Sequence, residues 1–277
     1  MQGKHIAVWF SCGAASAVAA KLTLEKYGKD NKISILNNPI VEEGEDNQRF
    51  LRDVEKWLDV KIEHIISHRF PTQSCEDVWE HERYMSGPVG ASCTRALKKV
   101  PRQRWERENH PDWTVLGFTA GEQGMADRFR RTERETLLTP LIEEGYTKQD
   151  CFDVINNAGL KLPELYLSGL PNANCLGCVK VGSPTYWNWL RVNYPDVFQR
   201  RLEQSEKIGA KLVVVKSKRL KLSELDPNAK GHPMKNYDVD CGLFCEEGCP
   251  VYTSDAADDL IWVTLGGPRI IKKKKKK

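Results

Sequence analysis

A run of apolar residues followed by a turn of small residues, close to the N-terminus, constrains the fold more than any other part of this sequence. Residues 6–10 are all apolar, as in a β-strand buried on both faces. The chain then passes through the small residues 11–14 into an alanine-rich stretch of high helix propensity. A strand, a small-residue turn and a helix N-terminus bring unpaired backbone N–H groups and the positive end of the helix dipole together. The pattern predicts a phosphate or sulfate site at this turn, with an ordinary strand-to-helix turn as the alternative.

Strand and helix patterns alternate along the following residues. Strands are predicted over 32–36, 61–66 and 114–118, and the apolar residues of 50–58 have the spacing of an amphipathic helix. This alternation predicts an α/β fold with a parallel sheet, which binds ligands at the carboxyl ends of its strands. The acidic residues between 42 and 47 are interpreted as an exposed loop, with Mg²⁺ binding as the alternative.

The composition divides the chain into three parts. We predict a nucleotide-binding α/β domain over 1–215, an irregular cysteine-bearing extension over 216–271, and a poly-lysine tail over 272–277. Residues 211–215 are predicted to form one more strand. The formal net charge is +4, but the six terminal lysines outweigh it, so the folded body is slightly acidic. The net charge therefore does not support nucleic-acid binding by the folded body. The lysine tail is interpreted as a solvated segment, and an arm that binds a polyanion is the alternative.

The sequence also indicates a compartment. It contains no run of about 18 apolar residues, so no membrane span is expected. The predicted strand begins within the first residues, where a secretory signal would need an apolar region and a cleavage site, so a cytoplasmic location is expected. Nine cysteines in such a protein favour metal ligands, redox thiols or buried thiols over disulfides.

Four segments, in this order, resemble the adenine-nucleotide α-hydrolase superfamily, which contains the PAPS and APS reductases and the PP-loop ATP pyrophosphatases. The segments are the small-residue turn 11–16, the Cys-x-x-x-x-Lys-x-x-Pro block 93–101, the Gly…Glu…Arg segment 117–128, and Thr139-Pro140-Leu141 with the C-x-x-C sequence 175–178 behind it. A looser match, Asp240-Cys241-Gly242-Leu243-Phe244, is similar to the Glu-Cys-Gly-Leu-His tail of the reductases. The chain is most similar to the PAPS reductase-like proteins of phages and bacteria. The resemblance implies a Rossmann-like core and an adenine nucleotide, PAPS, APS or ATP, as ligand.

The anion-binding residues predicted from the turn, the resemblance and the basic side chains are Ser11, Cys12, Gly13, Ala14, Ser16, Arg95, Lys98 and Arg128. The sequence departs from the family patterns at three places. Ala15 stands where the pyrophosphatases have an aspartate, which argues against ordinary ATP chemistry. Mg²⁺ is a further candidate cofactor of the bound nucleotide. Ser92 replaces one cysteine of the Cys-Cys pair of iron–sulfur APS reductases, and Phe244 replaces the tail histidine.

The cysteines suggest a metal site. Cys175 and Cys178 form a C-x-x-C sequence, in which two thiolates can bind one metal. The resemblance implies that Cys93 lies beside them, so that three thiolates hold a [4Fe–4S] cluster, or a fourth from Cys241, Cys245 or Cys249 completes a zinc or cluster site. We predict the ligands Cys93, Cys175, Cys178 and Cys245, with buried, unreactive thiols as the alternative. Cys12, Cys75 and Cys151 are interpreted as packing residues, although a helix N-terminus would lower the pKa of Cys12.

Three functions follow. The leading one is a sulfonucleotide reductase-like oxidoreductase in which the Cys241 thiolate attacks the sulfur of PAPS or APS, and a thioredoxin-like thiol donor then releases sulfite. The second is an ATP-dependent sulfur transferase that adenylates a nucleobase or nucleic acid and uses a three-cysteine cluster. The third is a nucleotide-binding, metal-stapled protein without catalysis.

Overall fold

The computed structural model describes residues 1–87 and 90–234. Cys241, Cys245 and Cys249, most of the predicted extension and the whole lysine tail lie outside the described residues, so the predictions made for them stay predictions. No helix in the described ranges is both long enough and apolar enough to cross a bilayer.

A five-stranded parallel sheet forms the centre of the fold, with strand order β3-β2-β1-β6-β7. Its strands are β1 (His5–Trp9), β2 (Lys32–Asn37), β3 (Glu63–His64), β6 (Trp113–Val115) and β7 (Leu137–Leu138). Strand β1 is central and pairs with β2 on one side, from His5 opposite Lys32, and with β6 on the other, from Ile6 opposite Trp113. The predicted α/β fold with a parallel sheet is therefore confirmed, and its strand order reverses beside β1, where Rossmann-like sheets bind ligands.

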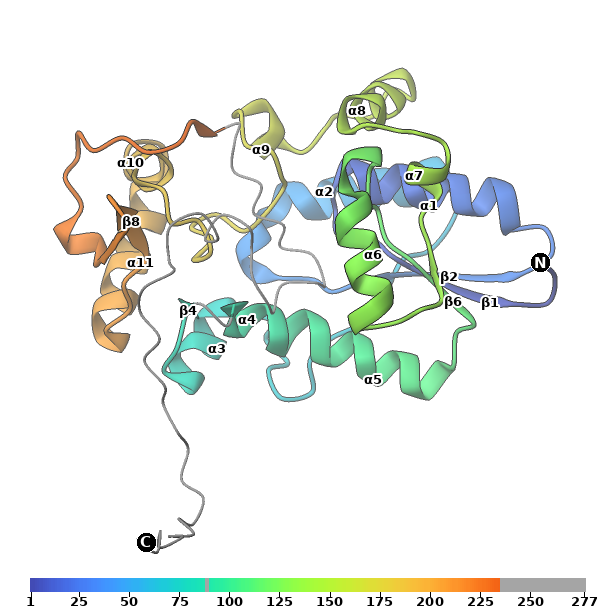
Figure 1. Cartoon of the computed structure of the whole chain (residues 1–277), viewed down its shortest axis with the longest axis horizontal. Helices are drawn as coiled ribbons and strands as arrows, with labels where there is room; N and C mark the ends of the chain where they lie inside the picture. Colours follow the sequence, from blue (N-terminus) through green and yellow to red (C-terminus); the bar gives the residue numbers. More distant parts are fainter. Residues whose placement is uncertain (88–89, 235–277) are drawn as a thin grey trace, which may run out of the picture.

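Helices connect and cover these strands (Figure 1). The α-helices are α1 (Ala14–Tyr27), α2 (Gly44–Leu58), α3 (Cys75–Glu82), α4 (Ser92–Thr94), α5 (Val100–Asn109), α6 (Gln123–Thr132), α7 (Pro140–Glu143), α8 (Lys148–Asn157), α9 (Glu164–Leu167), α10 (Pro184–Asn193) and α11 (Pro195–Ile208). The short helices η1 (Val41–Glu43), η3 (Ala120–Glu122) and η4 (Leu222–Glu224) are 3₁₀, and η2 (Arg95–Lys99) is a π-helical turn that joins α4 to α5.

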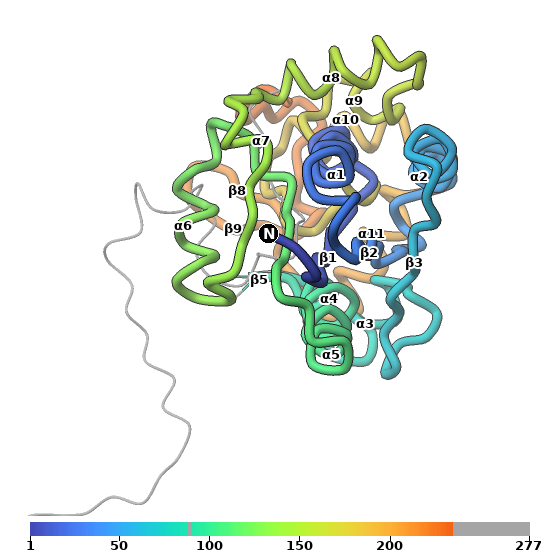
Figure 2. The backbone as a smooth tube through the Cα atoms, turned by 90° about the vertical axis from the view of Figure 1, so that its right-hand side faces the viewer, coloured from blue at the N-terminus to red at the C-terminus, as the bar shows by residue number. Residues whose placement is uncertain are grey.

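The alternation of side chains along β1 sends apolar groups to both faces of the sheet. Ile6, Val8 and Phe10 pack in a core with residues of α1, α2, α7 and α8. Ala7 and Trp9 pack on the opposite face, in a core with residues of α5 and α6. The end-on view of Figure 2 shows α1 and α5 on opposite sides of β1. A strand covered on both faces has to be apolar throughout, which is the pattern by which it was predicted.

A third core lies beyond the carboxyl edge of the sheet. It contains residues of α3, α4, α10 and α11, together with four cysteines that come from distant parts of the chain. Figure 1 shows α10, α11 and β8 at the end of the molecule away from the N-terminus. This lobe and the sheet enclose the functional site described below.

Two sequence predictions of secondary structure differ from the structure. The third strand is confined to Glu63–His64 because only Leu36 and Asn37 of β2 pair with it. The strand predicted at 211–215 is present as β8 (Val213–Val215), which pairs with β9 (Lys218–Leu220) in an antiparallel hairpin outside the central sheet. A second small hairpin, of β4 (Ser86–Gly87) and β5 (Gly90–Ala91), precedes α4. The acidic segment after β2 is helical rather than a loop, since it forms η1 and the first turn of α2.

Gly117 allows the end of β6 to approach the first turn of α1 closely. A Cβ atom at this position would lie 2.8 Å from both the Cα and the backbone N of Ser16. Backbone atoms cannot move aside as a flexible side chain does, so any side chain at Gly117 would push α1 away from the sheet.

We therefore expect Gly117→Ala to lower the free energy of unfolding by about 1–3 kcal/mol, measured by urea denaturation. Gly121→Ala is the matched control, because a Cβ there would meet nothing within 4 Å. Equal stabilities of the two variants would show that the approach of β6 to α1 is not constrained by Gly117.

Candidate functional site

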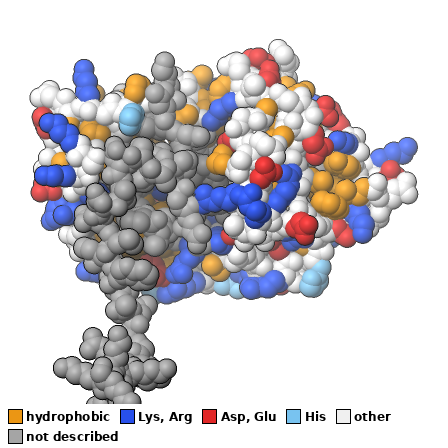
Figure 3. Space-filling view, viewed as in Figure 1, with side chains coloured by type: hydrophobic (Ala, Val, Ile, Leu, Met, Phe, Trp, Pro, Cys, Tyr) orange, Lys and Arg blue, Asp and Glu red, His pale blue; other side chains and the backbone are white. Residues whose placement is uncertain are grey.

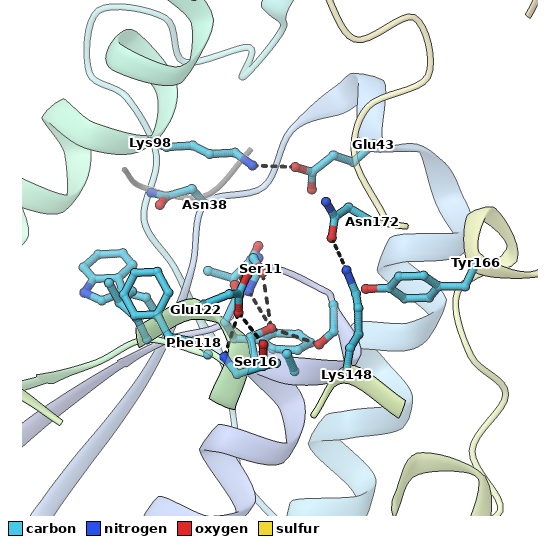
Figure 4. A pocket seen from close by; sticks show the side chains of 18 residues that line it. Ser11, Ser16, Asn38, Glu43, Lys98, Phe118, Glu122, Lys148, Tyr166 and Asn172 are labelled. Atoms are coloured by element: carbon cyan, nitrogen blue, oxygen red, sulfur yellow. Dashed lines mark hydrogen bonds and ion pairs between the residues drawn. The ribbon is translucent and has the colours of Figure 1, made fainter. Parts of the chain in front are cut away.

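A cavity opens at the carboxyl edge of the sheet, between the turn after β1 and the ends of β2 and β6 (Figure 4). Its lining residues come from the β1–α1 turn, the β2–α2 connection, the η2 turn, the β6–α6 connection and the segment 148–172; they include Ser11, Gly13, Ala15, Ser16, Asn37, Glu43, Lys98, Phe118, Glu122, Lys148, Tyr166 and Asn172. We call this space the loop cavity. It lies at the position where the strand order reverses, as the parallel sheet predicts.

Internal hydrogen bonds fix the predicted anion-binding turn. The Ser16 hydroxyl donates to the Gly13 carbonyl oxygen over 2.9 Å and accepts the backbone N–H of Ser11 at 3.1 Å. Of the predicted residues, Ser11, Gly13 and Ser16 line the loop cavity, whereas Cys12 and Ala14 are buried in the core beneath it. The turn therefore presents small side chains and its backbone to the cavity, as a site for phosphate or sulfate requires.

Cys12 does not have the properties expected of a thiol at a helix N-terminus. Its backbone has a φ of 58°, and its side chain is buried against Asn37, whose Nδ2 atom lies 3.5 Å from the sulfur. Burial raises the pKa of this thiol well above its usual value, and the carboxylate of Glu43 raises it further. The expectation of a lowered pKa was wrong, because the left-handed backbone turns the side chain into the core, where the thiolate would lose its hydration.

Tyr166 is a component of the site that the sequence analysis missed. Its hydroxyl oxygen accepts backbone N–H groups of Ala14 and Ala173, and it lies 3.0 Å from where a Cβ of Gly13 would be. Desolvation raises its pKa to about 12, so it stays neutral over the physiological range. The hydroxyl therefore accepts a hydrogen bond from an N–H group at the start of α1 that would otherwise be available to an anion.

Lys98 and Glu43 form a buried ion pair at the rim of the loop cavity. The two side chains point toward each other, with Nζ of Lys98 2.7 Å from Oε1 of Glu43 (Figure 4). Both are almost fully buried, at 9% and 4% side-chain exposure, so neither charge is screened by solvent. The prediction of an exposed acidic loop is wrong at Glu43, because this residue lies in η1 and its carboxylate points toward the π-helical turn that carries Lys98. The sequence could have indicated that Glu43 lines the site, since it is an acidic residue shortly after β2, and the carboxyl end of β2 lies at the cavity.

Two further polar groups line the loop cavity from the α6 and α8 regions. The Glu122 carboxylate accepts the backbone N–H and the hydroxyl of Thr119, each over 2.7 Å, in a capping box. Lys148 donates to the side-chain oxygen of Asn172 over 2.6 Å. Lys148 directly follows Thr147, which caps the start of α8 and forms a capping box with Asp150.

Arg95 and Arg128 lie outside the walls of the loop cavity. Arg95 is exposed on η2, and Arg128 is half-buried on α6. Figure 3 shows basic side chains gathered over the middle of one face, where Figure 1 places α6. The role predicted for both arginines in binding an anion remains a prediction.

Four buried cysteines surround a second, smaller cavity. Cys75 begins α3, Cys93 lies in α4, and Cys175 and Cys178 belong to the turn before α10. The predicted approach of Cys93 to the C-x-x-C turn is confirmed in position. Cys75, predicted to be a packing residue, is buried in this core, and the fold also brings it into the same cluster. We call these four side chains the thiol cluster.

The C-x-x-C turn is held by two neighbouring side chains. The Tyr186 hydroxyl accepts the backbone N–H groups of Gly177 at 2.9 Å and Cys178 at 3.1 Å, and Nε of Arg201 donates to the Gly177 carbonyl oxygen over 3.1 Å. Gly177 has a φ of +71°, and a Cβ there would lie 2.9 Å from Cγ of Arg201. The turn is therefore rigid and depends on glycine at this position.

Lys98 also lines the second cavity, so the thiol cluster and the loop cavity share one cationic side chain. As placed, no group of three or more His, Cys, Asp or Glu side chains in the described ranges forms a metal-ion site. Within the described part of the chain, no disulfide joins the cysteines of the cluster to one another. Cys151, predicted to be a packing residue, is buried in the core beside α1.

A comparison with protein-family models finds no match, and a comparison with curated proteins finds none either. Among solved structures, the chain is similar to a PAPS reductase from Candida auris in complex with phosphate, with 12% identity, a TM-score of 0.42, and coverage of 60% of this chain and 78% of that one. It is also similar to the U34-tRNA thiolase NcsA from Methanococcus maripaludis with its [4Fe–4S] cluster, with 14% identity, a TM-score of 0.39, and coverage of 88% and 84%. Both TM-scores are below 0.5, so this likeness by itself says nothing about the chemistry of the site.

The position of Tyr166 leads to a prediction about the turn. We expect Tyr166→Phe to lower the free energy of unfolding by about 1–3 kcal/mol, because the N–H of Ala14 loses its acceptor. Inorganic phosphate should then stabilise this variant more than the wild type, since the freed N–H is available to the anion. Thermal unfolding with and without phosphate measures both effects.

Tyr146→Phe is the control, because Tyr146 packs against the same core and the structure shows no hydrogen bond from its hydroxyl within the described ranges. An unchanged response to phosphate in Tyr166→Phe would mean that the hydroxyl does not compete with an anion for the turn.

Proposed function

We propose that this protein is a sulfonucleotide reductase-like oxidoreductase, which binds an adenine sulfonucleotide in the loop cavity and carries out sulfur chemistry beside the thiol cluster. The observation that carries this proposal is the position of Lys98, which lines both cavities. A nucleotide held by the turn would place its anionic end beside this ammonium group and therefore near the cysteines.

The lining of the loop cavity supports a nucleotide ligand. The turn of Ser11, Gly13 and Ser16 offers small side chains and backbone at a helix N-terminus, while Phe118 contributes an apolar wall suited to a base. Oδ1 of Asn37, which is buried in this wall, has no hydrogen-bond partner in the described part of the chain. An acceptor of this kind fits a ligand with N–H or O–H donors, such as a nucleoside.

The thiol cluster supports a metal centre by its donor set. Cys93, Cys175 and Cys178 are soft sulfur donors around one cavity with apolar walls, and such donors select zinc or an iron–sulfur cluster. A centre bound there would hold the C-x-x-C turn and α4 together beside the loop cavity, while Lys98, which lines both cavities, supplies the positive charge. The thiols must lose their protons for this, so metal binding would depend on pH. The fourth ligand predicted from the sequence, Cys245, lies outside the described residues, and its role stays a prediction.

The proposed reaction begins with the Cys241 thiolate, which attacks the sulfur of the bound sulfonucleotide. A bond forms between the two sulfur atoms, and the bond from sulfur to the phosphate oxygen breaks, so that the adenosine phosphate leaves with the electron pair. A dithiol donor of the thioredoxin-like class then attacks the Cys241 sulfur, releases sulfite and ends as its own disulfide after a second thiol reacts. Lys98 and the turn would hold the anionic leaving group during the first step.

A second candidate, an ATP-dependent sulfur transferase that modifies a nucleobase or nucleic acid, is favoured by the two carboxylates of the loop cavity. Glu43 and Glu122 both line it, and oxygen ligands of this kind suit Mg²⁺ bound together with a nucleotide triphosphate. Ala15 in place of an aspartate argues against this reaction. The third candidate, a nucleotide-binding protein without catalysis, shares the site and differs only in turnover.

Product analysis separates these candidates. We expect the anaerobically purified protein to release sulfite from PAPS or APS when a dithiol donor is present, and Cys241→Ser to reduce this release to background. Cys151→Ala is the control, because Cys151 lies in another core. Full sulfite release by Cys241→Ser would disprove the role of this cysteine. Pyrophosphate release from Mg²⁺-ATP without sulfite would support the sulfur transferase, and nucleotide binding without any product would support the third candidate.

Binding measurements test the role of Lys98. We expect Lys98→Met to weaken the binding of a sulfonucleotide about 10- to 100-fold in calorimetry, because one charge-assisted hydrogen bond to the anion is lost. Lys99→Met is the matched control, since Lys99 is the next residue of η2, pairs with Glu133 over 2.7 Å and lines neither cavity.

Removal of Lys98 leaves the buried Glu43 carboxylate without this cation, which can unfold the protein. The double variant Lys98→Met/Glu43→Gln removes both charges and separates the loss of binding from the loss of stability. Unchanged affinity in this double variant would show that the anion binds without Lys98.

A further inference from the structure

Cys75 is the member of the thiol cluster that no sequence motif marks. It is the first residue of α3, it is buried at 3% exposure, and it lines the same small cavity as Cys93, Cys175 and Cys178. Its thiol lies within hydrogen-bonding reach of the thiols of Cys175 and Cys93. Cys75 therefore contacts both parts of the proposed metal site, the C-x-x-C turn and the α4 cysteine.

The distance between the sulfur atoms of two thiols in contact is close to the distance between two sulfur ligands of the same metal ion. Sulfur ligands at about 2.3 Å from a tetrahedral zinc ion lie about 3.8 Å from one another. This separation is close to that of two thiols in van der Waals or hydrogen-bonded contact. No group of three ligands in the described ranges is yet placed around one point, so the thiols in contact with Cys75 would turn toward a common centre when a metal replaces their protons.

Backbone hydrogen bonds fix Cys75 at this place. The side-chain oxygen Oε2 of Glu42 accepts the backbone N–H of Cys75 over 2.9 Å, and the main-chain oxygen of Glu42 accepts the N–H of Leu176 at 3.1 Å. Leu176 lies inside the C-x-x-C turn, so one residue joins the start of α3 to that turn. The Ser74 hydroxyl caps α3 by accepting the N–H groups of Glu76 and Asp77. The position of the Cys75 thiol thus follows from an N-terminal cap and from Glu42, not from packing alone.

We propose that Cys75 is the fourth sulfur ligand of the metal centre and completes a set with Cys93, Cys175 and Cys178. The inference rests on the proposed function, which places a metal at these cysteines, and it assigns the ligand that the sequence analysis sought in the C-terminal segment. Ser92 stands where the similar reductases have a further cysteine, and Cys75 supplies the missing sulfur from α3.

A set of four thiolates has a chemical consequence. It saturates a zinc ion or the four irons of a cluster with protein ligands, and such closed sites are structural or electrostatic rather than open to substrate. This arrangement agrees with a reductase-like reaction at Cys241 and disagrees with sulfur delivery from an open iron. It also leaves Cys241, Cys245 and Cys249 without a required role as metal ligands.

Metal retention tests the inference without an activity assay. The full-length chain is produced anaerobically as wild type, Cys75→Ala and Cys151→Ala, and iron, zinc and sulfide are measured together with the visible spectrum. We expect Cys75→Ala to lose metal to a chelator at least about tenfold more readily than the wild type, since even outer-shell substitutions cost 10–100-fold in affinity. Cys151→Ala should match the wild type, because Cys151 is equally buried but far from the cluster in another core.

The outcomes separate this inference from the proposed function. If the wild type and Cys75→Ala retain the same metal equally well, while Cys93→Ala loses it, the metal site stands and Cys75 is not a ligand. If the reconstituted wild type binds no metal, the metal centre of the proposed function is itself wrong. Circular dichroism of each variant shows whether metal loss reflects unfolding, and Cys75→Ser, which keeps the size of the side chain, repeats the test if Cys75→Ala does not fold.

Discussion

The buried ion pair of Lys98 and Glu43 is the interaction on which the arrangement of the site depends. Both charges are shielded from solvent, so each requires the other to offset the loss of its hydration. Their contact fixes η1, which follows β2, against the π-helical turn that joins α4 to α5. A π-turn in a helix is itself an unfavourable element that is usually found at functional sites. Here it carries the side chain that lines both cavities.

The segment η1 connects the two halves of the site through consecutive residues. Glu43 faces the loop cavity through its pair with Lys98, while Glu42 binds the backbone of Cys75 and of Leu176. A displacement of this short helix would therefore move the walls of the loop cavity and the thiol cluster together. Such coupling is what a reaction needs when an anion is held in one cavity and sulfur atoms are held in the next. The cation of Lys98 gives the two cavities a common electrostatic environment.

The fold could be predicted from the sequence to a large extent because its signals are local. The apolar run of β1, its small-residue turn and the alternating strands and helices each depend on residues that are close in sequence, and the resulting parallel sheet was confirmed. Predictions were wrong or incomplete where long-range pairing decided the outcome. Residues 211–215 contain the predicted strand, but its partner β9 could not be read from the sequence. Glu43 lies in an acidic stretch typical of an exposed loop, but it is buried in an ion pair with Lys98, which is 55 positions away in the sequence.

The sequence by itself determined the parallel α/β core, the small-residue turn between β1 and α1 and the C-x-x-C element, since each is encoded by neighbouring residues whose spacing carries the information. Only the tertiary structure decided which distant side chains meet these elements. It placed the Tyr166 hydroxyl over the turn, turned Cys12 into the core, and brought Cys75 to Cys93 and Cys175. The reason is physical: contacts between distant residues depend on how helices pack around the sheet, and no periodicity along the chain records that packing.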